Sequence, residues 1–347
     1  MDSRTQNMRQ TYSFDDVLLT PKFSDIISRG DVSINSEMGS KVSLDLPLIS
    51  SPMDTVTEAE MATTLSKHGG LGIIHRYNTI PEQAKLAYDA WTFGSNNIGA
   101  AIGMRGDYFE RAIALVKSGA NVLCVDVAHG HHLMMEKCLK SLKDKFGEDI
   151  HIMAGNVATL EAFDALASWG ADSVRVGIGG GSICSTRIVT GHGIPTLQSV
   201  FDCAQTSYGT KIVADGGIKT TGDMVKALAA GADFVMVGSV LAGTDETPGR
   251  VSVNAKGDKY KEYRGMASKE AQRSWRGKNS TPEGVATVVP YKGSVVDILE
   301  DISGGIRSGL SYTGARNIKE LQGRADFVLQ SSAAQLESNT HILWRHS

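Results

Sequence analysis

Short apolar runs alternate with longer amphipathic stretches along most of this chain. The short runs are rich in valine, isoleucine and leucine, and the stretches between them place apolar residues three and four positions apart, as helices do. Strands are predicted at Leu46–Ile49, Leu71–His75, Asn97–Ile102, Val122–Asp126, His151–Ala154, Ser173–Gly177, Lys211–Ala214 and Phe234–Val237. Helices are predicted between them, among them Thr57–Lys67, Pro81–Asp89, Tyr108–Lys117, Leu160–Trp169 and Gly222–Ala230. Eight strand–helix units in succession predict a (β/α)8 barrel, the TIM barrel.

Polar and glycine-rich segments follow the predicted strands. Each such segment, taken alone, could be an ordinary turn, but eight at one rim of a barrel predict an active site, because barrel enzymes build theirs at the C-terminal ends of the strands. The segments after the seventh and eighth strands, Asp215–Gly217 and Gly238–Ser239, are in the positions where such barrels often bind phosphate.

Composition and charge narrow the class of protein. The chain has 347 residues, a net charge of −3 and no proline-rich linker or solenoid repeat, so we predict one barrel domain over residues 1–347, without nucleic acid or a membrane as partner. Met1–Gln6 is polar, and no apolar run reaches the length of a membrane span. Four cysteines without a Cys-x-x-Cys pair predict a reducing compartment, the cytoplasm.

The chain continues well past the eighth predicted strand, and residues 251–292 are predicted to form a lid or flap. Val251–Lys261 alternates like a small hairpin, and the polar stretch Lys269–Pro282 predicts a mobile cover over the rim. Two helices, near Val295–Ser308 and Asn317–Ala325, are expected to close the fold.

Cys184 ends a glycine-rich turn, Gly179–Gly181, and is flanked by hydroxyl side chains. Glycines let backbone N–H groups converge on an anion, and a cysteine beside them could attack a phosphorylated small molecule. Most single cysteines are buried core residues, but the density of glycine favours a nucleophile.

A metal site is suggested by three nearby histidines, His129, His131 and His132. We discount it because neighbouring side chains converge poorly on one ion.

Segments spread along the chain resemble those of a known enzyme family: Phe14–Leu19, Met53–Val56, Gly155–Thr159, Val176–Gly179, Gly181–Cys184, Ala214–Ile218, Met236–Ser239, Tyr263–Met266 and Pro290–Gly293. Together, over nearly the whole length, they are similar to the IMP dehydrogenase/GMP reductase family. In that family a cysteine forms a covalent bond to C2 of the purine, and the resemblance assigns this role to Cys184. The dehydrogenase branch hydrolyses the adduct to XMP, and the reductase branch expels ammonia from GMP and reduces the adduct to IMP with NADPH.

Three features favour the reductase branch. The chain runs from Ala90–Gly94 straight into the third strand, without the regulatory domain pair that dehydrogenases usually insert there. Between Met266 and Glu283 it lacks the Arg-Tyr pair with which the dehydrogenase activates water. Asp126–Gly130 resembles the reductase sequence, whereas Thr281–Val285 and residues 335–338 have a dehydrogenase character. We therefore predict a GMP reductase, with an IMP dehydrogenase as the alternative.

The resemblance also implies roles for individual residues. Catalysis is assigned to Cys184, Thr186 and Glu283, although Glu283 considered alone would be a solvated loop carboxylate. Substrate binding is assigned to Met53, Ser182, Asp215, Gly217, Gly238, Ser239, Tyr263, Gly265 and Met266. The cofactor, NADPH, is assigned to Arg76, Asp126, Ala128 and Asn156, with Ser28 and Arg29 of a neighbouring subunit at its extra phosphate. The carbonyls of Gly179, Gly181 and Cys184 could hold K⁺.

The partners implied are GMP and IMP, and the expected assembly is a homotetramer. Two further readings stay open. An FMN-dependent barrel oxidoreductase would share the phosphate site after the seventh and eighth strands. A catalytically silent nucleotide-binding relative would share the whole fold, but the presence of Cys184, Thr186 and Glu283 speaks against it.

Overall fold

The computed structural model describes residues 8–39, 41–277, 281–338 and 340. Eight parallel strands close into a barrel in the order β10-β11-β4-β5-β6-β7-β8-β9. Their bounds are β4 Leu48–Ser50, β5 Leu71–Ile74, β6 Gly99–Ile102, β7 Val122–Asp126, β8 His151–Val157, β9 Ser173–Val176, β10 Lys211–Asp215 and β11 Phe234–Val237. The predicted barrel is confirmed, and β7 and β11 have the predicted bounds.

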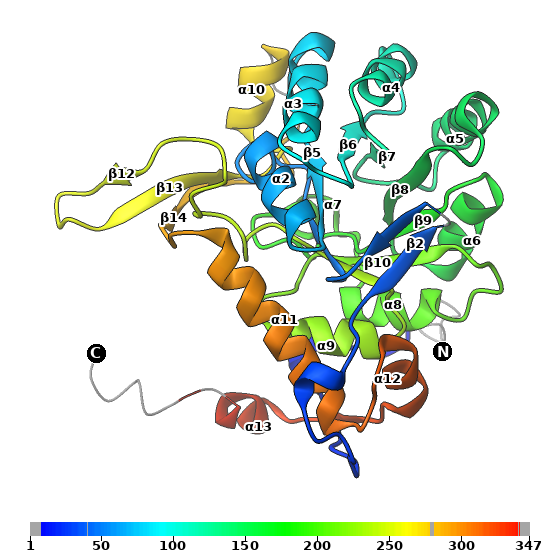
Figure 1. Ribbon diagram of the computed structural model, residues 1–347, viewed down its shortest axis with the longest axis vertical. Helices are drawn as coiled ribbons and strands as arrows, with labels where there is room; N and C mark the ends of the chain where they lie inside the picture. Colours follow the sequence, from blue (N-terminus) through cyan, green and yellow to red (C-terminus); the bar gives the residue numbers. More distant parts are fainter. Residues whose placement is uncertain (1–7, 40, 278–280, 339, 341–347) are drawn as a thin grey trace.

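Helices form a ring around the barrel (Figure 1). They are α2 Ala59–Lys67, α3 Ile80–Thr92, α4 Tyr108–Lys117, α5 Leu133–Phe146, α6 Leu160–Ser168, α8 Thr196–Cys203, α9 Thr221–Ala229 and α11 Val295–Tyr312. Local chemistry fixes where two of them begin, because Thr79 and Glu82 form a capping box at α3, as Thr220 and Asp223 do at α9. In the described part of the chain, no helix combines the length and apolarity needed to cross a membrane.

The interior of the barrel is filled with side chains and closed at its N-terminal end. The hairpin of β2 (Ser36–Gly39) and β3 (Val42–Leu44) inserts Met38 and Leu44 into this interior, where both are buried beside Ile49 and Phe234. A packed barrel with one end covered leaves the C-terminal ends of the strands as the face for a site.

Residues 251–277 and 281–292, which follow β11, are called the arm, and its strands project from the barrel (Figure 1). The predicted hairpin is confirmed as β12 (Ser252–Val253) paired with β13 (Lys259–Arg264), and β14 (Ala286–Pro290) returns beside β13. Between them, α10 (Lys269–Arg276) is a helix that the sequence analysis did not predict. It is anchored by only a few buried side chains, Ala271 and Gln272 among them, which is why apolar periodicity does not reveal it. The mobility of this lid stays a prediction, and residues 278–280 lie outside the described part.

Segments near the two ends of the described chain pair with each other. Strand β1 (Val17–Leu19) follows the short helix η1 (Phe14–Asp16) and pairs with β15 (Phe327–Leu329). The short helix η2 (Arg29–Asp31) packs against α11, and α12 (Ile318–Arg324), α7 (Thr186–Thr190) and α13 (Ser332–Glu337) complete the described helices. The predicted polar N-terminus, residues 1–6, lies outside the described part.

Helix α2 packs against β5 with no room for a side chain at Gly72, where a Cβ would lie 2.5 Å from the Cα of Ala62. We expect Gly72→Val to lower the free energy of unfolding by about 1–3 kcal/mol, measured by urea denaturation, because overpacking forces the backbone to move. Gly323→Ala in α12 is the matched control: a Cβ there meets nothing within 4 Å, and helix propensity predicts a gain of about 0.5–1 kcal/mol. Equal stability of Gly72→Val and wild type would contradict this packing.

Candidate active site

A pocket of about 570 Å³ lies at the C-terminal ends of the barrel strands. Its walls contain every residue that the sequence assigned to catalysis and to substrate binding, together with Arg76, Asp126, Ala128, Asn156, Gly179 and Gly181. Ser28 and Arg29 do not line it. They lie at η2, which packs against α11 of the same chain. Their assignment to a neighbouring subunit's cofactor stays a prediction.

Cys184 is the accessible cysteine of the four. Its thiol donates a hydrogen bond to the Thr186 hydroxyl, with 3.1 Å between Sγ and Oγ1, and the residue is half-buried in the pocket wall. The other three are buried, and burial raises the pKa of the Cys124, Cys138 and Cys203 thiols to about 12. Because only a thiolate is a strong nucleophile, these three are unsuited to attack, and Cys184 is the candidate.

Backbone hydrogen bonds join the loop that contains Cys184, residues 179–185 (the cysteine loop), to residues 283–285 of the arm. The N–H of Ser185 donates to the Glu283 carbonyl at 3.0 Å, and the N–H of Val285 donates to the Ile183 carbonyl at the same distance. The N–H of Glu283 in turn donates to Ala267 at 3.1 Å. These bonds bring Glu283, ninety-nine positions from Cys184 in the sequence, into the same pocket.

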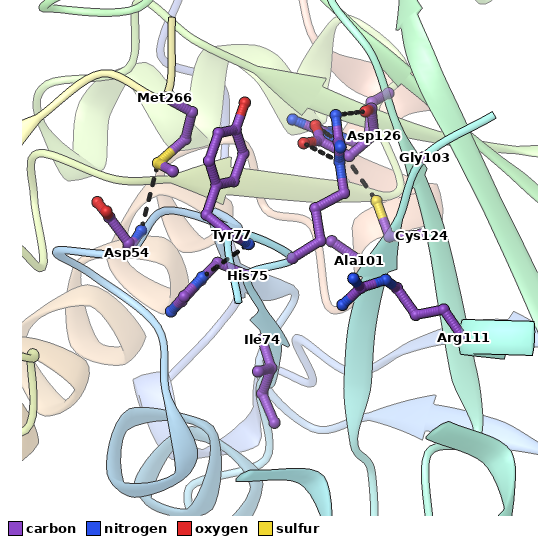
Figure 2. A network of polar contacts seen from close by, with 12 residues as sticks. Asp54, Ile74, His75, Tyr77, Ala101, Gly103, Arg111, Cys124, Asp126 and Met266 are labelled. Atoms are coloured by element: carbon purple, nitrogen blue, oxygen red, sulfur yellow. Dashed lines mark hydrogen bonds and ion pairs between the residues drawn. The ribbon is translucent and has the colours of Figure 1, made fainter. Parts of the chain in front are cut away.

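A half-buried ion pair holds the end of β13 against the barrel. The Arg264 guanidinium at the end of β13 bonds to the Asp54 carboxylate, with 3.0 Å between Nε and Oδ2. The backbone N–H of Asp54 also contacts Sδ of Met266 at 3.3 Å, as Figure 2 shows. This pair places Gly265 and Met266 over the loop that follows β4, where both line the pocket beside Met53.

Arg175 lines the pocket and binds two of the assigned carboxylates at once. Its Nη1 is 2.6 Å from Asp126 Oδ1, and its Nη2 is 2.8 Å from Asp215 Oδ2. Asn156 also donates to Asp215 Oδ2 at 2.8 Å. Burial opposes the charge on Arg175, but Asp215 and Asp126 raise the pKa of the guanidinium well above its usual range. The site therefore contains a fixed cation between two carboxylates.

The sequence analysis missed Arg175, although a signal was present. Arg175 is a charged residue inside the apolar run Ser173–Val176, where every residue is buried in the structure. A buried charge requires a partner. Two acidic residues provide it: Asp215 ends β10, which pairs with β9, and Asp126 ends β7, which lies one strand further away beyond β8. Such a charge within a predicted core strand could have indicated the ion pair.

Arg76 contains a buried donor without a hydrogen-bond partner on the Asp126 side of the pocket. Its Nη2 donates to the Asp126 carbonyl at 3.1 Å, but its buried Nε is 3.7 Å from Asp126 Oδ2 and has no hydrogen-bond partner in the described structure. The guanidinium lies over the Tyr77 ring, which contacts Trp275 of α10. An unpaired N–H beside a carboxylate fits a ligand that carries both a donor and an acceptor, such as the carboxamide of a nicotinamide.

The end of the pocket opposite Asp126 is built from backbone and hydroxyl groups. Gly216 and Gly217 have φ of 92° and 78°, a region that favours glycine. A Cβ at Gly238 would be 3.0 Å from Met53 Sδ and 3.2 Å from the Tyr263 hydroxyl, so the chain there approaches both closely. Glycine backbones with nearby hydroxyls are the donors that phosphate prefers in such barrels.

The loop that was assigned to K⁺ already contains a cation. The Arg187 guanidinium donates to the carbonyls of Ile178 at 3.2 Å and Ile194 at 2.7 Å, while the Gly181 carbonyl accepts the N–H of Cys184 at 3.1 Å. Within the described ranges no three His, Cys, Asp or Glu side chains are grouped so as to bind a metal. Potassium at Gly179, Gly181 and Cys184 stays a prediction.

The contribution of the Arg175 charge to stability can be measured by removing it, because Asp126 and Asp215 would then lose their shared cation. We expect Arg175→Met to lower the free energy of unfolding by about 3–5 kcal/mol, because it leaves two carboxylates without their buried cation. Arg175→Lys, which keeps the charge, should recover part of the loss. Urea denaturation of the three proteins measures this. Equal losses in Arg175→Met and Arg175→Lys would contradict the ion-pair account.

Comparison with known proteins agrees with this geometry. Residues 11–341 match the model of the IMP dehydrogenase/GMP reductase domain. The chain is 38% identical to the inosine-5′-monophosphate dehydrogenase of Cryptosporidium parvum, over 97% of this chain and 96% of the relative. It is 33% identical to the GMP reductase of Leishmania major, over 95% and 96%. A crystal structure of Trypanosoma brucei GMP reductase, a cysteine-to-alanine variant in complex with guanosine 5′-monophosphate, superposes with a TM-score of 0.92 at 31% identity, covering 98% of this chain and 99% of the other.

The comparisons also show that an inserted segment does not separate the two branches. The alignment with the L. major GMP reductase spans 474 positions, and the alignment with the dehydrogenase of Nitrosopumilus maritimus, 34% identical over 96% of this chain and 98% of the relative, spans 470. Both exceed the 347 residues present here, so both relatives carry long segments without a counterpart. The absence of an inserted domain pair after Ala90–Gly94 therefore does not favour the reductase branch. With its barrel, its cysteine loop and its arm, this chain belongs to the IMP dehydrogenase/GMP reductase family of oxidoreductases.

Proposed function

We propose that this protein is a GMP reductase, which converts GMP to IMP and ammonia with NADPH through a bond between Cys184 and C2 of the purine. The observation that carries the proposal is that Cys184, Thr186 and Glu283 line one pocket, while the arm beside them lacks the pair that would deprotonate water. The Thr186 hydroxyl is 3.1 Å from the Cys184 sulfur, and Glu283 lines the same pocket. Residues 267–282 contain no tyrosine, so the Arg-Tyr pair of the dehydrogenase cannot form there.

The residues suit the steps that deamination needs. The Cys184 thiolate adds to C2 of guanine, and the C2–N bond then breaks as the exocyclic amine leaves with a proton. Ammonia is a poor leaving group unless it is protonated, and Thr186 with Glu283 would deliver that proton. The bond between sulfur and C2 breaks again when C2 has been reduced, which returns the thiolate. Bound NADPH would supply the hydride for that reduction.

Substrate binding is proposed along the length of the pocket. Asp215 would accept from ribose hydroxyls through Oδ1, because Arg175 and Asn156 already occupy Oδ2. Met53, Gly265 and Met266 would flank the base. Gly217, Gly238, Ser239, Ser182 and Tyr263 would bind the 5′-phosphate. The 3.4 Å separation between the Ser182 and Tyr263 hydroxyls leaves room for both to turn toward an anion.

The cofactor would lie on the Asp126 side of the pocket. Arg76, with its unpaired Nε, would hold the nicotinamide carboxamide together with Asp126, Ala128 and Asn156. The preference for NADPH over NADH, the contribution of Ser28 and Arg29 from a second subunit, the homotetramer and the cytoplasmic location stay predictions.

The dehydrogenase is the alternative within the family, because relatives from both branches match over nearly the whole chain. We expect rapid loss of nicotinamide absorbance with GMP and NADPH, and little steady-state XMP with IMP and NAD, because the final hydrolysis lacks its water-activating pair. Steady-state spectrophotometry with both pairs tests this. Multiple-turnover XMP formation at a rate comparable to GMP reduction would assign the protein to the other branch.

The nucleophile has its own test. Cys184→Ala should abolish turnover while GMP still binds, because the adduct cannot form but the phosphate, ribose and base contacts remain. Calorimetric titration with GMP beside the kinetic assay separates the two effects. Cys203→Ala, at a buried cysteine outside the pocket, is the control and should keep its activity. More than a small residual rate in Cys184→Ala would remove this cysteine from the mechanism.

A further inference from the structure

Two lysine side chains of the arm bind the loop that follows β11, residues 238–247. Lys261 of β13 is buried, and its Nζ donates to the carbonyls of Thr244 at 3.0 Å and Thr247 at 2.6 Å. Lys292, which follows β14, donates from its Nζ to the carbonyls of Ser239 and Val240, both at 2.9 Å. Ammonium groups thus hold two separate parts of this loop by their backbone oxygens.

The position of Lys292 fixes the direction of the peptide groups next to the pocket. A trans peptide is planar, so its N–H points opposite to its C=O. With the Ser239 carbonyl turned toward Lys292, the N–H of Val240 points away from it. The next peptide is held at both ends, since the Val240 carbonyl accepts from Lys292 while the N–H of Leu241 donates to Gly238 at 3.1 Å.

The N–H groups at the start of this loop are available for a ligand. In the described structure, Ser239 and Val240 have no hydrogen-bond acceptor for their backbone N–H groups, and Gly238 and Ser239 line the pocket. Successive unpaired N–H groups form a concavity that binds anions. Lys292 itself is not among the residues that line the pocket, so its charge lies behind the loop.

We propose that Lys292 is a positioning residue for the 5′-phosphate: by binding the Ser239 carbonyl it turns the N–H of Val240 away from itself and toward the phosphate, and by binding the Val240 carbonyl it holds the start of the loop in place. The inference rests on the proposed nucleotide site but not on the direction of the reaction, because both branches of the family bind IMP. Lys292 does not line the pocket, so it acts on phosphate binding alone.

The test measures binding of IMP without a nicotinamide, so that no reaction can occur. Lys292→Met should weaken IMP binding by about tenfold in calorimetric titration, because charge-assisted hydrogen bonds to the loop are lost. The phosphorus NMR signal of bound IMP should move toward that of free IMP. In turnover, the KM for GMP should rise by a similar factor while kcat changes less than about twofold. Lys292→Arg, which can also donate to two carbonyls, should restore most of the affinity.

Lys259→Met is the matched control. Lys259 is on the same sheet, with its Nζ 5.5 Å from the Tyr291 ring centroid, and within the described residues its side chain makes no hydrogen bond or ion pair to the loop. The IMP affinity and phosphorus signal of this variant should therefore equal those of wild type. If Lys292→Met does not fold, Lys292→Gln, which keeps one donor but no charge, takes its place. Unchanged IMP affinity and phosphorus signal in the folded variant, or equal losses in Lys259→Met, would overturn the inference. Failure of wild type to bind IMP would instead overturn the proposed function.

Discussion

The candidate site is arranged around the guanidinium of Arg175. It is buried at the end of a core strand, where a charge is tolerated only with its partners present. Because those partners are Asp126 and Asp215, the cation fixes the relative position of the two ends of the pocket, one assigned to the nicotinamide and one to the ribose. It also occupies one oxygen of Asp215 and so leaves the other free to accept from a ligand.

A second set of contacts completes the site from outside the barrel. The arm is fixed by the ion pair of Arg264 with Asp54 and by backbone bonds between the cysteine loop and residues 283–285. Because these bonds are between backbone groups, they place Glu283 near Cys184 without specifying the side chain at that position. The same frame can therefore serve either branch of the family, and the choice depends on which side chains the arm carries. Here the arm carries a glutamate and lacks the Arg-Tyr pair.

The fold and the family rest on the closed barrel and on relatives that match over nearly the full chain. The reductase assignment rests on fewer groups, since the absence of an inserted segment does not distinguish the branches and relatives of both kinds are similarly identical. What distinguishes them is chemical: the dehydrogenase must activate water to hydrolyse the adduct, whereas the reductase must protonate the departing amine to form the adduct and then reduce it with a hydride.

The sequence by itself determined the barrel and the rim on which the candidate site lies, and it singled out Cys184 as the candidate nucleophile, because apolar periodicity and glycine-rich turns are local signals. It could not determine the helix α10, whose few anchoring side chains are buried only against the rest of the folded chain. Nor did it reveal the ion pairs of Arg175 or the contacts of Lys261 and Lys292 with the loop after β11. Those partners are far apart in the sequence, and a long charged side chain shows no periodic preference for one partner over another. Only closure of the barrel and return of the arm bring them within hydrogen-bonding distance.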